Sequence, residues 1–134
     1  MRNRFALAIA LLPLLAACGG DRAVTRGAAL YAQDCAICHG ADMRGGGGAG
    51  VEGLSGIPPD LTVLSRQAGG EFPRAEVLGI LERYAQGAQQ GRMMQPFTHL
   101  SAEQSARVRT AEGRKRVPKP QADLLAWLEA MQRP

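Results

Sequence analysis

Leu30-Tyr31-Ala32-Gln33-Asp34-Cys35-Ala36-Ile37-Cys38-His39-Gly40 is the stretch that decides the fold. Two residues separate Cys35 from Cys38, so a helical backbone places both thiols on one turn. His39 follows directly and adds an imidazole at the same place. The stretch therefore offers two sulfur atoms and one nitrogen ligand to a single group.

The spacing C-x-x-C-H is the attachment signature of a c-type haem. In this interpretation Cys35 and Cys38 form thioethers to one covalently bound haem c, and His39 ligates its iron. A thioredoxin-like redox pair would need a βαβ setting, but the neighbouring sequence is helical and glycine-rich. A zinc site would need a second pair of ligands, and outside the motif only His99 is available. A disulfide between Cys35 and Cys38 is the remaining alternative, and the histidine beside them favours haem.

A second iron ligand is expected in the segment Gly91-Arg92-Met93-Met94-Gln95-Pro96-Phe97. Thioether sulfur is a soft ligand, and His/Met ligation closes the iron to external ligands. Met94 is favoured, with Met93 as the alternative. A methionine can also simply fill a gap in the core. His99 is a third candidate, although a lone histidine in a loop is more often ordinary.

The composition indicates one small domain with few large aromatic side chains to fill its core. The chain has 134 residues, three cysteines and a formal net charge of +4. It contains only six aromatic residues, and 46% of its residues are apolar, which is too many for a disordered chain. A bound haem would supply the missing aromatic bulk.

The N-terminus has the layout of a secretory signal, which we expect to be removed over residues 1–17. Two arginines precede an apolar run that is too short to span a bilayer, so a retained membrane helix is the weaker interpretation. The run ends Leu15-Ala16-Ala17-Cys18, which resembles the lipobox of bacterial lipoproteins. Cys18 would then carry lipid and hold the protein on the periplasmic side of a membrane. Gly19 weakly favours the outer membrane, and an ordinary cleavage site near Cys18 is the alternative. Residues 18–24 would form a short lipidated linker before a domain over 25–134.

Apolar spacing predicts three helices, over residues 23–34, 73–86 and 120–132. Their inward residues would be Val24, Ala28 and Tyr31 in the first, Val77, Ile80, Leu81 and Tyr84 in the second, and Leu124, Leu128 and Met131 in the third. The stripe on the second helix would wall the haem. Its Tyr84 hydroxyl would either donate to a haem propionate or lie at the edge of the core.

The remaining segments are shorter. Residues 40–56 contain eight glycines and predict a connecting loop. Residues 101–104 have the form of a capping box and predict a short helical turn. Residues 108–117 alternate well enough to predict a small hairpin that turns near Glu112 and Gly113.

In this order of parts, the chain resembles the class I c-type cytochromes over nearly all of residues 25–132. The resemblance implies an all-α fold of three to four helices around a covalently bound haem, with the hairpin as the one addition. It also implies that Gly27 and Tyr31 meet Trp127 of the last helix, and that a carbonyl of Pro58 or Pro59 accepts the His39 Nδ1 proton. Two features depart from the family's pattern. Gln95 follows Met94 where the family usually has proline, and a basic insertion precedes the last helix.

That insertion holds six basic residues against the single acid Glu112. The basic residues are Arg107, Arg109, Arg114, Lys115, Arg116 and Lys119. Such a cluster could steer an acidic redox partner, touch anionic headgroups, or form an ordinary solvated hairpin. Export from the cytoplasm excludes nucleic acid as the partner.

The sequence thus predicts a membrane-anchored monohaem protein that carries single electrons between redox partner proteins. We do not expect an enzyme, because no carboxylate pair or nucleophile with a base is evident. The alternative is a haem domain whose sixth position is labile or open, acting as a gas or redox sensor or a weak peroxidase.

Overall fold

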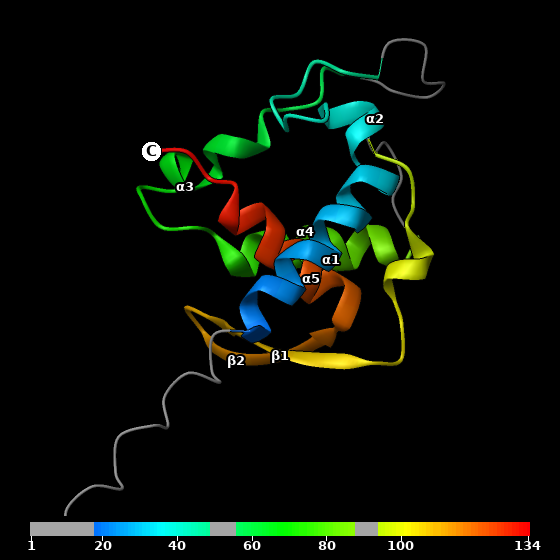
Figure 1. Cartoon of the computed structure of the whole chain (residues 1–134), viewed down its shortest axis with the longest axis vertical. Coiled ribbons are helices and arrows are strands. Elements are labelled where there is room, and N and C mark those ends of the chain that lie inside the picture. Colours follow the sequence, from blue (N-terminus) through cyan, green and yellow to red (C-terminus); the bar gives the residue numbers. More distant parts are fainter. Residues whose placement is uncertain (1–17, 49–55, 88–93) are drawn as a thin grey trace, which may run out of the picture.

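The computed structural model describes residues 18–48, 56–87 and 94–134, and it is mostly helical (Figure 1). In chain order its elements are α1 (Cys18–Asp34), α2 (Ala36–His39), the 3-10 helix η1 (Leu61–Val63), α3 (Leu64–Gln67), α4 (Arg74–Ala85), the 3-10 helix η2 (Thr98–Leu100), β1 (Ser105–Thr110), β2 (Gly113–Pro118) and α5 (Lys119–Ala130). Within the described residues, none of the helices has the length and apolar character that crossing a membrane requires.

The crossing of α1 over α5 organises the molecule. A Cβ atom on Gly27 would lie 2.7 Å from the Trp127 Cβ and would overlap the carbonyl of Asp123, so only glycine allows this approach. The expected meeting of Gly27 with Trp127 is therefore present in the structure. The first helix begins at Cys18, five residues before the predicted start, so residues 18–22 continue the same helix.

The α4 helix closes the core from another side. It follows Phe72 and Pro73 and ends before Gly87, whose φ of +74° stops the helix. Val77 is buried as expected, whereas the other predicted inward residues of α4 are only half-buried. Leu78, which the predicted stripe omitted, is 1% exposed and belongs to the core. The buried face is thus rotated toward Leu78.

The predicted hairpin is confirmed and is longer than expected. β1 and β2 pair antiparallel with Ser105 opposite Pro118 and Thr110 opposite Gly113. Val117 is buried, and both strands contact α5. The hairpin therefore covers one end of α5.

Two local predictions were wrong. Residues 101–104 form no helical turn, because Ser101 Oγ donates to the carbonyl of Ala85 instead of capping a helix, and the chain then enters β1. The last helix ends at Ala130, so Met131 is 38% exposed rather than inward. Gln132 takes the inward position, and its amide nitrogen donates to the carbonyl of Leu61 (2.8 Å).

Candidate haem-binding site

The two motif cysteines lie at the junction of α1 and α2. The backbone N–H of Cys35 donates to Tyr31 at the end of α1, and the N–H groups of Cys38 and His39 both donate to the carbonyl of Cys35. A single turn therefore holds both thiols and the imidazole. Cys35 and Cys38 are free and half-buried, so no disulfide occupies them.

Tyr31 holds this turn in place through a hydrogen bond. Its side chain is 3% exposed, and its hydroxyl donates to the carbonyl of Gly40, directly after the motif (2.6 Å). Burial raises the pKa of the Tyr31 hydroxyl, with smaller effects from Cys35 and Asp42. The hydroxyl therefore stays protonated and remains a donor at neutral pH. Tyr31 thus has a second role besides the expected packing against the last helix.

The His39 ring is held in one orientation and one tautomer. It is 6% exposed, and its Nδ1 lies 3.2 Å from the carbonyl oxygen of Pro59. Since a carbonyl can only accept, Nδ1 carries the proton and Nε2 keeps its lone pair. Burial lowers the pKa of His39, although the bond to Pro59 opposes this, so the ring is neutral. Of the two proline carbonyls left open by the sequence, the one in contact is that of Pro59.

The glycine-rich segment does more than connect α2 to the proline segment. The N–H of Gly45 donates to His39 (2.8 Å), and the N–H of Gly46 donates to Pro58 (3.1 Å). Gly45 has a φ of +79°, and a Cβ atom there would lie 2.7 Å from the carbonyl carbon of Pro59. Glycine is therefore required where this segment passes between His39 and the prolines that hold it.

Met43 is a residue of this site that the sequence reasoning missed. It is 1% exposed and has a φ of +64°, in the left-handed region that methionine rarely adopts. Its N–H donates to Gly40 and its carbonyl accepts from Leu61. Its place amid glycines gave no periodic signal. Met43 fills the core beneath the motif.

The electrostatics of Cys35 fit a covalently modified sulfur better than a free redox thiol. Burial, with Asp34 and Cys38 adding to it, raises the pKa of Cys35 to about 12. Thiols that exchange disulfides or bind metals need a lowered pKa, because the thiolate is the reactive form. The buried thiol therefore does not resemble that of a thioredoxin-like pair.

The candidate second ligands lie on a different segment. Met94 is half-buried at the start of the last described segment, and Met93 lies outside the described residues. This segment is tied to α4 because the N–H of Phe97 donates to the carbonyl of Tyr84 (2.9 Å). His99 is half-exposed, and its Nε2 lies 2.8 Å from Oδ2 of Asp34. That ring nitrogen is therefore engaged in a hydrogen bond with Asp34.

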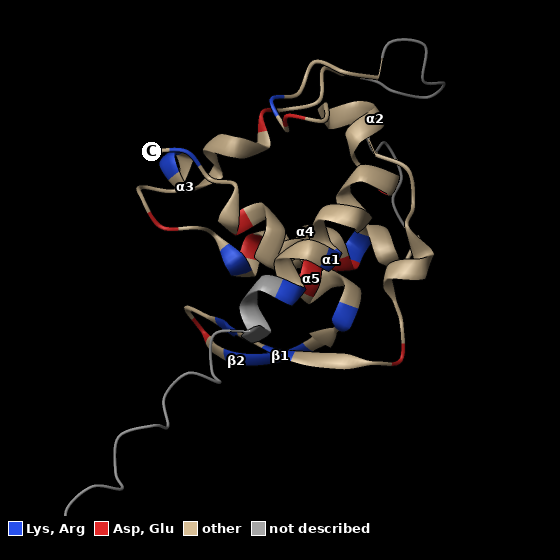
Figure 2. Ribbon diagram, viewed as in Figure 1, with Lys and Arg blue, Asp and Glu red and all other residues tan. Residues whose placement is uncertain are grey.

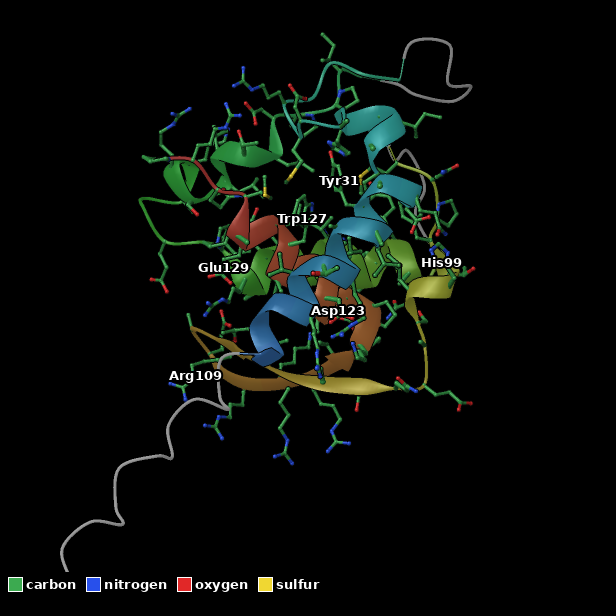
Figure 3. All side chains as sticks on the ribbon, in the orientation of Figure 1. Tyr31, His99, Arg109, Asp123, Trp127 and Glu129 are labelled. Carbon is green, nitrogen blue, oxygen red and sulfur yellow. The ribbon has the colours of Figure 1, made fainter. Side chains whose placement is uncertain are left out.

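One buried donor in the core has no acceptor among the residues that the structure describes. It is Nε1 of Trp127, which packs against the same core cluster as Cys35 and Tyr31 (Figure 3). An unpartnered buried N–H costs about 1–3 kcal/mol. A large apolar group that also carries acceptor oxygens fits this surrounding, and haem with its propionates is such a group. Two free thiols on one turn and a neutral imidazole with a free Nε2 fit the same cofactor.

Comparison with known proteins agrees with this geometry. The family model described as Cytochrome c matches residues 24–110, which is more than half of the chain. No curated protein and no solved structure matches the chain. The matched range contains the motif, the glycine-rich segment, the prolines, α4 and both candidate methionines. The chain therefore belongs to the cytochrome c family, whose members bind one covalently attached haem c and transfer electrons.

Proposed function

We propose that the protein is a periplasm-facing, membrane-anchored carrier of single electrons. Cys35 and Cys38 would hold the haem through thioethers, and His39 and Met94 would ligate its iron. When bound, the haem iron accepts and releases one electron. The observation that carries the proposal is the His39 ring, one residue after the second thiol. It is buried and neutral, its Nδ1 donates to Pro59, and its Nε2 has no partner among the described residues.

The protein's own residues supply orientation and exclusion of water. Pro59 fixes the His39 tautomer, and Tyr31 fixes the backbone that follows. His39 and Met94 together would leave the iron no open position, so we infer a carrier rather than an enzyme. The Tyr84 hydroxyl would lie at the edge of the site, where a propionate is one acceptor for it.

Partner contact is best supported at the α2 end. Ile37, between the two cysteines, is 63% exposed, and Ile57, just before the prolines, is 84% exposed. Large apolar side chains this exposed often mark an interaction surface. A redox partner that covers Ile37 would lie beside the attachment cysteines, where the path to the cofactor is short.

The membrane attachment would be through lipid on Cys18, with the outer membrane slightly favoured. Support comes from the sequence alone, since residues 1–17 lie outside the described part. Intact mass of the protein from the membrane fraction tests it. Lipidation predicts a mature chain that begins at Cys18 and carries added acyl mass. A chain beginning elsewhere without acyl mass contradicts this anchor.

The iron ligand is tested with two matched variants of the haem-loaded protein. Met94→Ala should abolish the charge-transfer band between methionine sulfur and ferric iron, and Met93→Ala should leave it in place. The reverse result would assign the ligand to Met93. If the parent protein has no such band, the sixth position is open or labile. The alternative function, a gas or redox sensor or a weak peroxidase, would then gain support. Gln95, which stands after Met94 where the family usually has proline, is consistent with a weaker bond from Met94 to iron.

A further inference from the structure

The outer surface of the hairpin carries four arginines, Arg107, Arg109, Arg114 and Arg116, which we call the hairpin face. All four are exposed. The strand register places Arg107 opposite Arg116 and Arg109 opposite Arg114. Basic residues follow both strands in Figure 2, and in Figure 3 long side chains, including that of the labelled Arg109, extend from the hairpin away from the helices.

This arrangement is unfavourable for the isolated domain. Like charges directly opposite one another on a sheet are destabilising. Among the described residues, none of the four arginines has an acidic partner, whereas Lys115 on the same strand pairs with Glu82 (3.1 Å). Four positive charges that repel one another and find no acidic partner in the described part of the chain indicate a negatively charged partner outside the domain.

The position of the hairpin face argues against a redox partner. In Figure 1 the hairpin lies at one end of the ribbon, and α2, which carries the second cysteine and His39, lies at the other. A protein docked on the hairpin face would therefore be separated from the attachment site by α4 and α5. Electron transfer favours contact at the α2 end instead.

The same view places the start of α1 at the hairpin end. Because α1 begins at Cys18, no extended linker separates that residue from the folded domain. A lipid on Cys18 would hold this end of the molecule against the bilayer, and the hairpin face would then meet the headgroups.

We propose that the hairpin face binds the anionic phospholipid headgroups of the membrane that anchors the protein. This inference rests on the proposed lipid attachment at Cys18. Each arginine near an anionic surface contributes about 1 kcal/mol, which is about fivefold in binding. The contact would orient the domain so that the α2 end faces away from the membrane toward its partners.

The test uses the haem-loaded full chain with Cys18→Ser, so that lipid insertion does not mask the hairpin. Sedimentation measures its binding to phosphatidylcholine vesicles with and without phosphatidylglycerol. Replacement of the pair Arg107→Gln and Arg116→Gln should weaken binding to the anionic vesicles roughly 25-fold. Added salt should also weaken binding of the parent protein, because it screens the attraction between the arginines and the anionic lipids.

The matched control removes two exposed arginines far from the hairpin, Arg66→Gln and Arg133→Gln, and should change binding less than about twofold. All proteins in the comparison carry the same residues 1–17, so their contribution cancels. Equal binding of the hairpin and control variants would overturn the proposal. So would unchanged vesicle binding combined with slower electron exchange with an acidic redox protein, which would assign the face to a protein partner. Lipid attachment at Cys18 is measured separately by mass. Failure of the lipid attachment and failure of headgroup binding can therefore be told apart.

Discussion

The two ends of the molecule treat polar groups in opposite ways. At the α2 end, the polar groups that matter have partners inside the fold: Tyr31 bonds Gly40, His39 bonds Pro59, and Gly45 bonds His39. On the hairpin face, four arginines have no acidic partner among the described residues. This contrast indicates that the α2 end holds a group within the domain, whereas the hairpin face meets a partner outside it.

The largest expected effect comes from removing the attachment at the α2 end. Cys35→Ser combined with Cys38→Ser should abolish covalent haem, because no thioether can form. Haem-dependent peroxidase staining after denaturing electrophoresis measures this. Cys18→Ser is the matched control and should keep the stain. A doubly substituted chain that still holds haem after denaturation would break the assignment.

The next largest effect, on the free energy of unfolding, is expected where α1 crosses α5. Gly27→Ala forces a methyl group into Trp127 and the Asp123 backbone, and we expect a loss of about 3 kcal/mol in unfolding free energy. Gly79→Ala on α4 is the control, since its Cβ would meet only the tip of Arg83 at 3.6 Å. It should gain about 0.5 kcal/mol. Urea unfolding followed by circular dichroism measures both, and equal effects would contradict the close crossing.

Charges that are paired within the fold should stabilise it, unlike the opposed arginines of the hairpin face. Asp123 is 5% exposed, and it accepts from Arg26 (2.7 Å) and Lys119 (2.6 Å). Burial alone would raise the pKa of Asp123, but these two partners outweigh it and the pKa is lowered. Asp123→Asn should therefore cost about 2 kcal/mol at neutral pH.

The sign of the pH dependence follows from the lowered pKa of Asp123. Its contribution is present above the unfolded value of about 4 and is lost as the pH falls through the lower folded value. The stability difference between the parent and Asp123→Asn should therefore shrink in acid. A difference that grows on acidification would show that the ion pairs do not stabilise the fold.

Tyr31→Phe tests the hydrogen bond that fixes the motif turn. The carbonyl of Gly40 would lose its donor, with an expected cost of about 1 kcal/mol. The haem should remain attached. Thermal unfolding of the haem-loaded variant measures the change, and unaltered stability would mean that the bond contributes nothing.

The smallest effect is expected at the hairpin face itself. Arg107→Gln with Arg116→Gln relieves one pair of opposed charges, so stability should rise by about 0.5 kcal/mol at low salt. Urea unfolding at low and high salt measures the gain, which salt should reduce. A clear loss of stability would show that these arginines have partners within the fold.

Much of the fold follows from short-range pattern. The apolar spacing located α4 and α5, alternation and Gly113 located the hairpin, and the motif spacing placed Cys35 beside His39 on one turn. Each of these features depends on residues close together in sequence. Local rules are sufficient for them because helices and hairpins form from neighbouring residues.

The features that were missed depend on which distant segment lies opposite. Met43 is part of the buried core, and its carbonyl accepts from Leu61, eighteen residues further along the chain. Met131 is exposed because α5 ends at Ala130, and Gln132 bonds Leu61 instead. Residues 101–104 have a capping pattern, but Ser101 bonds Ala85 of α4 instead. Sequence periodicity carries no information on these long-range contacts. The family resemblance implied the bond from His39 to a proline carbonyl, whereas neither the bond from Tyr31 to Gly40 nor the burial of Met43 could be predicted.

The proposed carrier function requires that the haem iron be closed on both sides. Carbon monoxide added to the reduced, haem-loaded protein at neutral pH tests it most directly. We expect a visible spectrum that is unchanged or changes only slowly and partially, since Met94 would occupy the sixth position. Rapid and complete formation of the carbon monoxide spectrum in the native protein would show an open sixth position and would favour a sensor or peroxidase.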